Sequence, residues 1–229
     1  MVKINISFKI ILLLFVQFSF SQKGLEKGFE YLDEFIPNIV FDLRYGSEDN
    51  FTGKVVKGYE NPRPVSTIEM AKALKEVQIY LELRGLGLKI FDAYRPQKAV
   101  DYFFEWSKVK TDTLMKSKYY PNEKKENLFK HGYISKLSGH SRGSSVDLTI
   151  INLIGEKAGE EIDMGSSWDY FGEKSSISST KINLIQRKNR IILKNLMQMF
   201  GFLPYEKEWW HFTIKKEPFP NKYFDFPTN

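Results

Sequence analysis

Residues 138–152 read SGHSRGSSVDLTIIN, a glycine-flanked turn followed by a run in which apolar and polar residues alternate. The alternation is typical of a β-strand, and we predict one over Ser145–Asn152. Asp147 lies within this strand, where aspartate is disfavoured by propensity. Because a buried aspartate must be paired or bound to a metal, Asp147 requires either a salt bridge or a metal ion. The glycines on either side of His140 let the backbone bend tightly around this histidine.

The segment upstream of this strand predicts one helix and one further strand. A capping box at Ser66 and Glu69 begins the helix, and Gly85 ends it. Its apolar positions recur at helical spacing: Met70, Ala71, Leu74, Val77 and Leu81. The next residues, Leu86–Ala93, form an apolar run that we interpret as a buried strand.

Two more helices and a last strand complete the predicted elements. Pro96 suits the first turn of a helix whose inward side chains are expected to be Ala99, Val100, Phe103 and Phe104. The other helix ends at Gly201 and carries Leu184, Ile185, Ile191, Ile192, Leu196 and Met199. The strand is expected over Trp209–Ile214. Because helices and strands do not alternate regularly, we predict a single α+β domain instead of a doubly wound sheet.

The composition narrows the chemistry that is available to the chain. It has 229 residues, 42% hydrophobic residues, three histidines and no cysteine. The absence of cysteine excludes disulfides, thiolate metal sites, iron–sulfur clusters and cysteine nucleophiles, so nitrogen and oxygen would have to hold any metal. The net charge of +6 is spread thinly along the chain, and we therefore expect no nucleic-acid partner.

The first residues have the pattern of a secretory signal peptide. Lys3 and Lys9 precede the short apolar run 10–16, and small residues at Ser19 and Ser21 suit cleavage after Ser21. The apolar run is shorter than the roughly 20 residues of a membrane-spanning helix, so we expect no stable membrane insertion after cleavage. We predict a signal peptide over 1–21, one domain over 22–229, and export to the periplasm or the medium.

The other two histidines differ in their surroundings. His211 follows Glu208 and two tryptophans in a run that predicts a partly buried strand. Strict alternation would put Glu208 and His211 on opposite faces, so both can serve one site only if Glu208 lies at the bend entering the strand. By themselves the two residues also fit a surface glutamate and a core histidine. His131 follows a lysine-rich segment, and we expect it to be exposed or to lie outside the site.

Together these residues suggest a zinc site. Two histidines and one carboxylate are a common ligand set for catalytic zinc, which lowers the pKa of its water to about 7. A nearby carboxylate could then take the proton, as Glu208 could if it reached the site. Arg95, between a predicted strand and Pro96, could stabilise an oxyanion, although an ordinary structural arginine fits equally well.

In combination, the motifs resemble a known family, the VanX-type zinc D-Ala-D-Ala dipeptidases of vancomycin resistance, which belong to the LAS metallopeptidases. The similarity covers almost all of the chain after the signal peptide. The similar segments, in order, are 49–54 (DNFTGK), 94–96 (YRP), 138–143 (SGHSRG), 164–165 (MG), 208–211 (EWWH) and 223–227 (YFDFP).

The resemblance implies a fold, a reaction and a set of residue roles. The fold would be of the LAS/Hedgehog type, with a central, mostly antiparallel sheet flanked by helices. One Zn²⁺ would be held by His140, Asp147 and His211, and the reaction would split D-alanyl-D-alanine into two D-alanines. Glu208 would act as general base and then acid, and Arg95 would stabilise the tetrahedral intermediate.

The resemblance also implies how the substrate is held. Asp169 would bind the free amino group of the dipeptide, and Tyr45 and Ser138 match further pocket positions. Gly139 is a departure, since close relatives of the resistance enzymes have serine there. The segment 153–163 is also slightly longer than in those enzymes.

Two alternatives stay open at this point. A related D,D-carboxypeptidase or endopeptidase would act on peptidoglycan peptides, and a zinc-binding module would have kept the fold without turnover. All three ligand candidates and Glu208 are present, which disfavours the second alternative. The sequence gives no indication of an oligomeric state.

Overall fold

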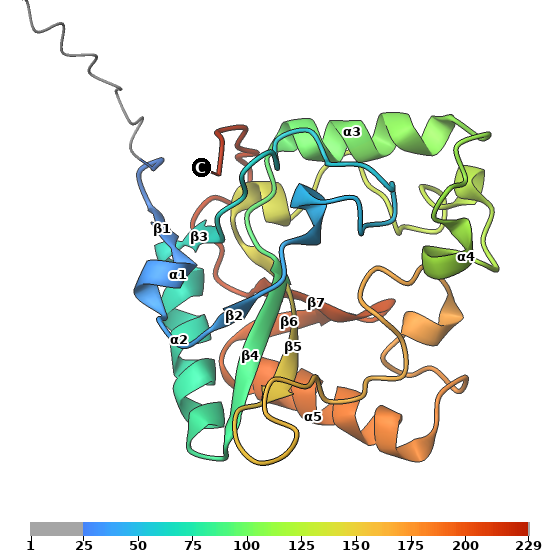
Figure 1. The fold of residues 1–229 in the computed structure, drawn as a ribbon. Coiled ribbons are helices and arrows are strands. Elements are labelled where there is room, and N and C mark those ends of the chain that lie inside the picture. Colours follow the sequence, from blue (N-terminus) through green and yellow to red (C-terminus); the bar gives the residue numbers. More distant parts are fainter. Residues whose placement is uncertain (1–24, 229) are drawn as a thin grey trace, which may run out of the picture.

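The computed structural model describes residues 25–228 and is built around one five-stranded sheet (Figure 1). The strand order is β2-β4-β5-β7-β6. Within the described residues β2 and β4 are parallel and the other pairs are antiparallel, so the expected mostly antiparallel sheet is confirmed. The strands are β2 (Val40–Phe41), β4 (Leu86–Asp92), β5 (Ser145–Asn152), β6 (Phe202–Tyr205) and β7 (Glu208–Ile214). The predicted signal peptide lies outside the described residues.

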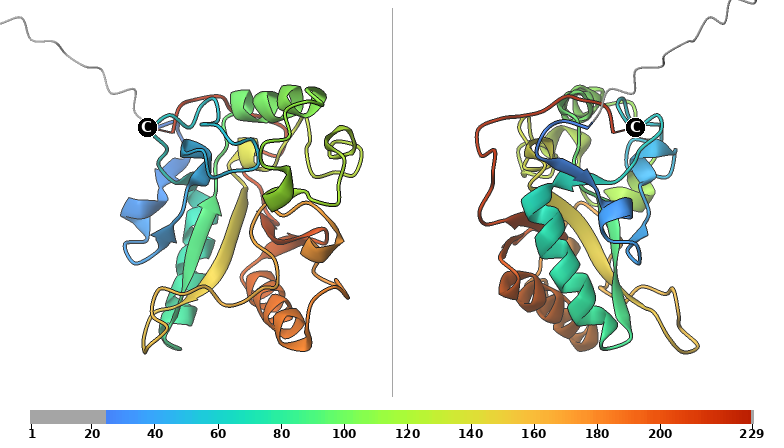
Figure 2. Two further views of the ribbon diagram at one scale, coloured as in Figure 1. Left: turned by 45° about the vertical axis from the view of Figure 1, so that its right-hand side comes forward. Right: turned by 90° about the vertical axis from the view of Figure 1, so that its left-hand side faces the viewer.

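Helices flank this sheet on one face and at one end. α2 (Ile68–Glu82) and α5 (Leu184–Met199) cover one face, and α3 (Gln97–Lys108) lies across the end at which β4 finishes (Figures 1 and 2). The remaining helices, α1 (Leu32–Phe35) and α4 (Lys116–Tyr119), are short. The five apolar side chains expected to face inward from α2 are all buried. No helix of residues 25–228 combines the length and apolar character needed to cross a membrane.

A second, two-stranded sheet lies in the N-terminal part of the described chain, and its Phe29 packs against the C-terminal tail. β1 (Phe29–Tyr31) pairs antiparallel with β3 (Val65–Thr67). Phe29 packs with Tyr94 and Phe224 in a separate aromatic cluster. The backbone N–H of Phe224 donates to the carbonyl of Ser141 at 2.8 Å. The C-terminal tail is therefore hydrogen-bonded to the turn that carries His140 and supports it.

Three details of the predicted helices are wrong. The capping box at Ser66 is absent, because Thr67 is the N-cap and the Ser66 hydroxyl donates to the carbonyl of Thr67. In α3 the side chain of Phe104 is only half-buried, and Trp106 is buried in its place. α5 ends close to Gly201 as expected, but most of the apolar residues that predicted it are not buried.

The buried side chains of α5 lie on the face opposite to most of its isoleucines. They are Arg190, Leu193, Leu196 and Met197. Of the apolar residues that predicted this helix, only Leu196 is buried, and the others are 45–79% exposed. The inward face includes Arg190, whose hydrogen bond to the Met164 carbonyl is a contact that hydrophobic periodicity does not register.

Candidate active site

Two adjacent strands and the turn before one of them bring three metal-ligand candidates together. Asp147 on β5 lies directly opposite His211 on β7 in the sheet register. Asp147 Oδ1 is 3.0 Å from His211 Nδ1 and 3.3 Å from His140 Nε2, and the two ring nitrogens are 3.2 Å apart. The cluster therefore offers two imidazole nitrogens and one carboxylate oxygen to one point.

The contacts behind the cluster fit a metal site. His140 Nδ1 donates to the carbonyl of Ala93 at 2.7 Å, which leaves the Nε2 lone pair directed into the cluster. The indole of Trp168 donates to Asp147 Oδ2 at 3.3 Å. Both His140 and Asp147 are buried. The donor atoms, their burial and the fixed imidazole tautomer suit a zinc ion.

Arg95 is held beside the cluster by an aspartate that the sequence did not single out. Its Nε donates to Asp92 Oδ2 at 2.8 Å, and the other oxygen of Asp92 accepts from the Tyr59 hydroxyl at 2.6 Å. The guanidinium lies 3.6 Å from Asp147 Oδ2. Asp92 precedes Arg95 by three residues at the end of β4, and this i, i+3 spacing was the one sequence signal for the pair.

Glu208 reaches the same site because the strand begins irregularly. It is the first residue of β7, where the pairing with β6 shifts between Pro204 and Tyr205. The expected position at the bend entering the strand is therefore confirmed, and Glu208 and His211 line one cavity. Burial raises the pKa of Glu208 well above its usual range, and the Asp147 and Asp169 carboxylates raise it further.

Asp169 lines the same cavity from the long connection between β5 and α5. Its backbone has φ +59°, a left-handed conformation that is rare outside glycine. The Tyr45 hydroxyl donates to Asp169 Oδ2 at 2.8 Å. Burial, followed by the charge of Asp147, raises the pKa of Asp169 well above its usual range. A cationic group arriving at this carboxylate would favour its ionised form.

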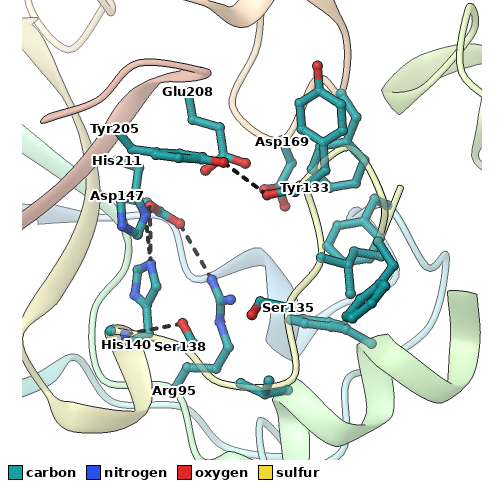
Figure 3. Close-up of a pocket in the computed structure, with 18 of the residues that line it drawn as sticks. Arg95, Tyr133, Ser135, Ser138, His140, Asp147, Asp169, Tyr205, Glu208 and His211 are labelled. Carbon is teal, nitrogen blue, oxygen red and sulfur yellow. Dashed lines mark hydrogen bonds and ion pairs between the residues drawn. The ribbon is translucent and has the colours of Figure 1, made fainter. Parts of the chain in front are cut away.

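The metal-ligand cluster, Arg95, Glu208 and Asp169 line one cavity of about 410 Å³. Figure 3 shows the His140–Asp147–His211 cluster and Arg95 on one side and Asp169 across from them. All eight residues predicted for the site line the cavity: Tyr45, Arg95, Ser138, His140, Asp147, Asp169, Glu208 and His211. His131 does not line it; its Nδ1 lies 3.0 Å from a carboxylate oxygen of Glu123.

The aromatic wall of the cavity was not predicted from the sequence. Phe103, Tyr133, Phe171 and Tyr205 all line it, and they come from four separate segments. Aromatic residues are common throughout this chain, so their type alone carried no signal.

The fold and the set of metal-ligand residues together define a class of protein. An α+β domain with two histidines, one aspartate, a nearby glutamate and an arginine in one cavity is the arrangement of a single-zinc hydrolase. The family model described as Peptidase_M15, D-ala-D-ala dipeptidase, matches residues 25–229. The chain belongs to this family, as its motifs predicted.

Two relatives with high sequence identity agree with this assignment. The chain is 42% identical over 202 residues to a D-alanyl-D-alanine dipeptidase of Enterococcus faecalis, covering 88% of this chain and 98% of that protein. It is 41% identical over 199 residues to one of Streptomyces coelicolor, covering 87% and 97%. A Zn(II) complex of the vancomycin-resistance D,D-pentapeptidase VanY matches at 14% identity with a TM-score of 0.39, covering 67% and 74%, which supports no conclusion about activity.

Proposed function

We propose that this protein is a zinc-dependent dipeptidase that hydrolyses D-alanyl-D-alanine to two D-alanines. The observation that carries the proposal is the convergence of a metal-ligand cluster, Glu208 and Asp169 on one small cavity. The relatives at 41–42% identity bear the name of this activity and cover the same residues.

The zinc would be held by His140, Asp147 and His211. When bound there, zinc supplies a Lewis acid that polarises a carbonyl and lowers the pKa of a water to about 7. The fixed tautomer of His140 and the indole contact to Asp147 keep the ligand atoms in place before the ion arrives.

Glu208 and Arg95 would carry out the chemistry at the peptide bond. Glu208 takes a proton from the attacking water as the new C–O bond forms, and gives it to the leaving nitrogen as the C–N bond breaks. Burial raises the pKa of Glu208, which favours the protonated form that donates to the leaving amine. Arg95, aimed by Asp92, stabilises the negative charge that develops on the carbonyl oxygen.

Asp169 and Tyr45 would select dipeptides by their free amino group. A buried carboxylate facing an ammonium makes a charge-assisted contact. Longer peptides have no free amine at this distance from the scissile bond, and they would leave Asp169 buried without its partner. Ser138 borders the cavity beside His140, and its hydroxyl accepts from the His140 backbone N–H at 3.2 Å.

The test combines metal analysis with a D-Ala-D-Ala hydrolysis assay. We expect Glu208→Ala to keep zinc and lose turnover, and His140→Ala to lose both. Full activity in Glu208→Ala would refute the assignment of the base. Preference for the N-acetylated dipeptide over the free one would reject the dipeptidase and favour a carboxypeptidase.

We also propose that the protein is exported. The support is the basic, apolar and small-residue pattern of residues 1–21. N-terminal sequencing of the mature protein should begin near Gln22. Recovery of a chain that starts at Met1 from the cytoplasmic fraction would reject the proposal.

A further inference from the structure

One buried arginine in α5 has no role in the chemistry described above. Arg190 is 1% exposed, and its guanidinium donates to four neutral oxygens. Its Nε donates to the carbonyl of Met164 at 2.6 Å, and one terminal nitrogen donates to the carbonyls of Lys174 and Ser176 at 2.8 and 2.7 Å. The other terminal nitrogen donates to the Ser166 hydroxyl at 3.1 Å.

These four acceptors lie at the two ends of the loop that carries Asp169. Met164 and Ser166 begin the loop, and Lys174 and Ser176 end it, so a single guanidinium closes the loop at its base. Asp169 lies midway between the two ends. Closing a loop at its base reduces the number of conformations open to the residues between the ends.

The residue held in this loop needs such support. Asp169 has φ +59°, which is unfavourable for a residue with a side chain, and its carboxylate is buried. Strained conformations persist only where the surroundings enforce them. The Tyr45 hydroxyl is one such contact at the carboxylate, and Arg190 acts on the backbone of the loop.

Ser166 extends the same network toward Glu208. The Trp209 indole donates to the Ser166 hydroxyl at 3.0 Å, and Trp209 directly follows Glu208 in β7. Arg190 therefore links the Asp169 loop, α5 and the start of β7. Burial lowers the pKa of Arg190 to about 10, because the buried position disfavours the charged form.

We propose that Arg190 is a positioning residue for Asp169 and thereby sets the selectivity for dipeptides with a free amino group. The proposal rests on the proposed function, in which Asp169 receives that amine. Lysine should not replace it, because an ammonium lacks the planar fork that reaches both ends of the loop at once.

The experiment measures kcat and KM of Arg190→Lys for free and N-acetylated D-Ala-D-Ala. We expect KM for the free dipeptide to rise at least about tenfold while kcat changes by less than about threefold, since ground-state and transition-state binding are lost equally. The rate with the acetylated form should stay unchanged, so the selectivity ratio should fall. Arg187→Lys, one turn earlier in α5, is the matched control and should keep the wild-type ratio. An unchanged ratio in Arg190→Lys, or equal losses with both substrates, would overturn the proposal.

Two further variants keep the result decisive. If Arg190→Lys does not fold, Ser166→Ala removes one acceptor of the network, and an unchanged selectivity ratio there also overturns the proposal. Asp169→Asn tests the proposed function itself. Retained amine selectivity in Asp169→Asn refutes the role of Asp169, whereas lost selectivity there with a wild-type ratio in Arg190→Lys refutes only the role of Arg190.

Discussion

At the scale of single residues, Gly139 and Ser145 compete for the same space beside the metal cluster. A Cβ at position 139 would overlap Ser145 Oγ and lie 3.2 Å from Ser145 Cβ. The Ser145 hydroxyl cannot rotate away without losing its 2.6 Å hydrogen bond to Thr213 Oγ1. The departure from serine at Gly139 therefore has a steric reason in this chain.

This competition predicts that the two positions are coupled in a double-mutant cycle. Gly139 has φ −59°, which alanine adopts without strain, so the cost of Gly139→Ala is steric. We expect it to reduce the free energy of unfolding by about 1–3 kcal/mol in the wild type, and by less than about 0.5 kcal/mol in the Ser145→Ala background. Urea unfolding of the four variants measures this coupling. Additive effects would show that the two positions do not compete.

A second prediction concerns the aim of Arg95. Asp92→Asn keeps the shape of the side chain but removes the charge that faces Arg95 Nε. Because charge-assisted hydrogen bonds contribute about 1.5–3 kcal/mol, kcat should fall by about tenfold to a hundredfold, with a smaller change in KM and unchanged zinc content. Asp42→Asn is the control, since Asp42 pairs with Arg44 outside the cavity and should leave kcat unaltered. A wild-type kcat in Asp92→Asn would contradict this positioning.

The sequence predicted the site residues that belong to recognisable motifs, but it did not predict the residues that hold those side chains in place. Asp147 was noticeable because an aspartate in an apolar strand needs an explanation, and His140 and Glu208 belonged to similar segments of a known family. Trp168 donates to Asp147 from 21 positions away, and no local pattern predicts that contact. Such partners are set by the register of the sheet and by loop paths.

At the scale of elements, the sequence predicted long segments well and their orientation less well. β5 has the predicted bounds, and α2 buries the predicted side chains. β6, with only four residues and a proline, was not predicted. Most apolar residues of α5 are exposed, because its inward face includes Arg190, whose polar contacts a hydrophobic pattern does not reveal.

The start of α5 gives a prediction at this scale. Asn183 and Gln186 form a capping box, with hydrogen bonds of 2.9 and 3.0 Å between each side chain and the other residue's backbone N–H. Asn183→Ala should lower the free energy of unfolding by about 1 kcal/mol, while Asn183→Asp should retain most of the stability. Ser66→Ala, at the start of α2, removes no cap and should not weaken the start of its helix. Denaturant unfolding measures the global effect, and amide exchange in the first turn of each helix locates it. Equal stability of Asn183→Ala and wild type would show that this cap contributes nothing.

At the scale of the whole molecule, the metal cluster joins segments that are far apart in the sequence. His140 precedes β5, Asp147 lies in β5 and His211 lies in β7, in a chain without cysteine. These three ligands come together only in the folded state, where one ion bound by all of them would link β5, β7 and the turn before β5. Its binding free energy therefore adds to the free energy of unfolding.

We accordingly expect zinc removal to destabilise the protein as well as to inactivate it. At a free zinc concentration of about 100 times Kd, binding contributes about 2.7 kcal/mol, which corresponds to a Tm shift of roughly 5–10 °C for a chain of this size. Chelation should produce this loss in the wild type and no loss in His140→Ala. Burial lowers the pKa of His211, so its ring should stay neutral and able to bind zinc in mildly acidic solution. The zinc-dependent part of Tm should therefore disappear only at lower pH, when the ligands become protonated. Calorimetry with and without chelator across this pH range measures the effect. A chelator-dependent shift that persists in His140→Ala would place the stabilising ion at another site.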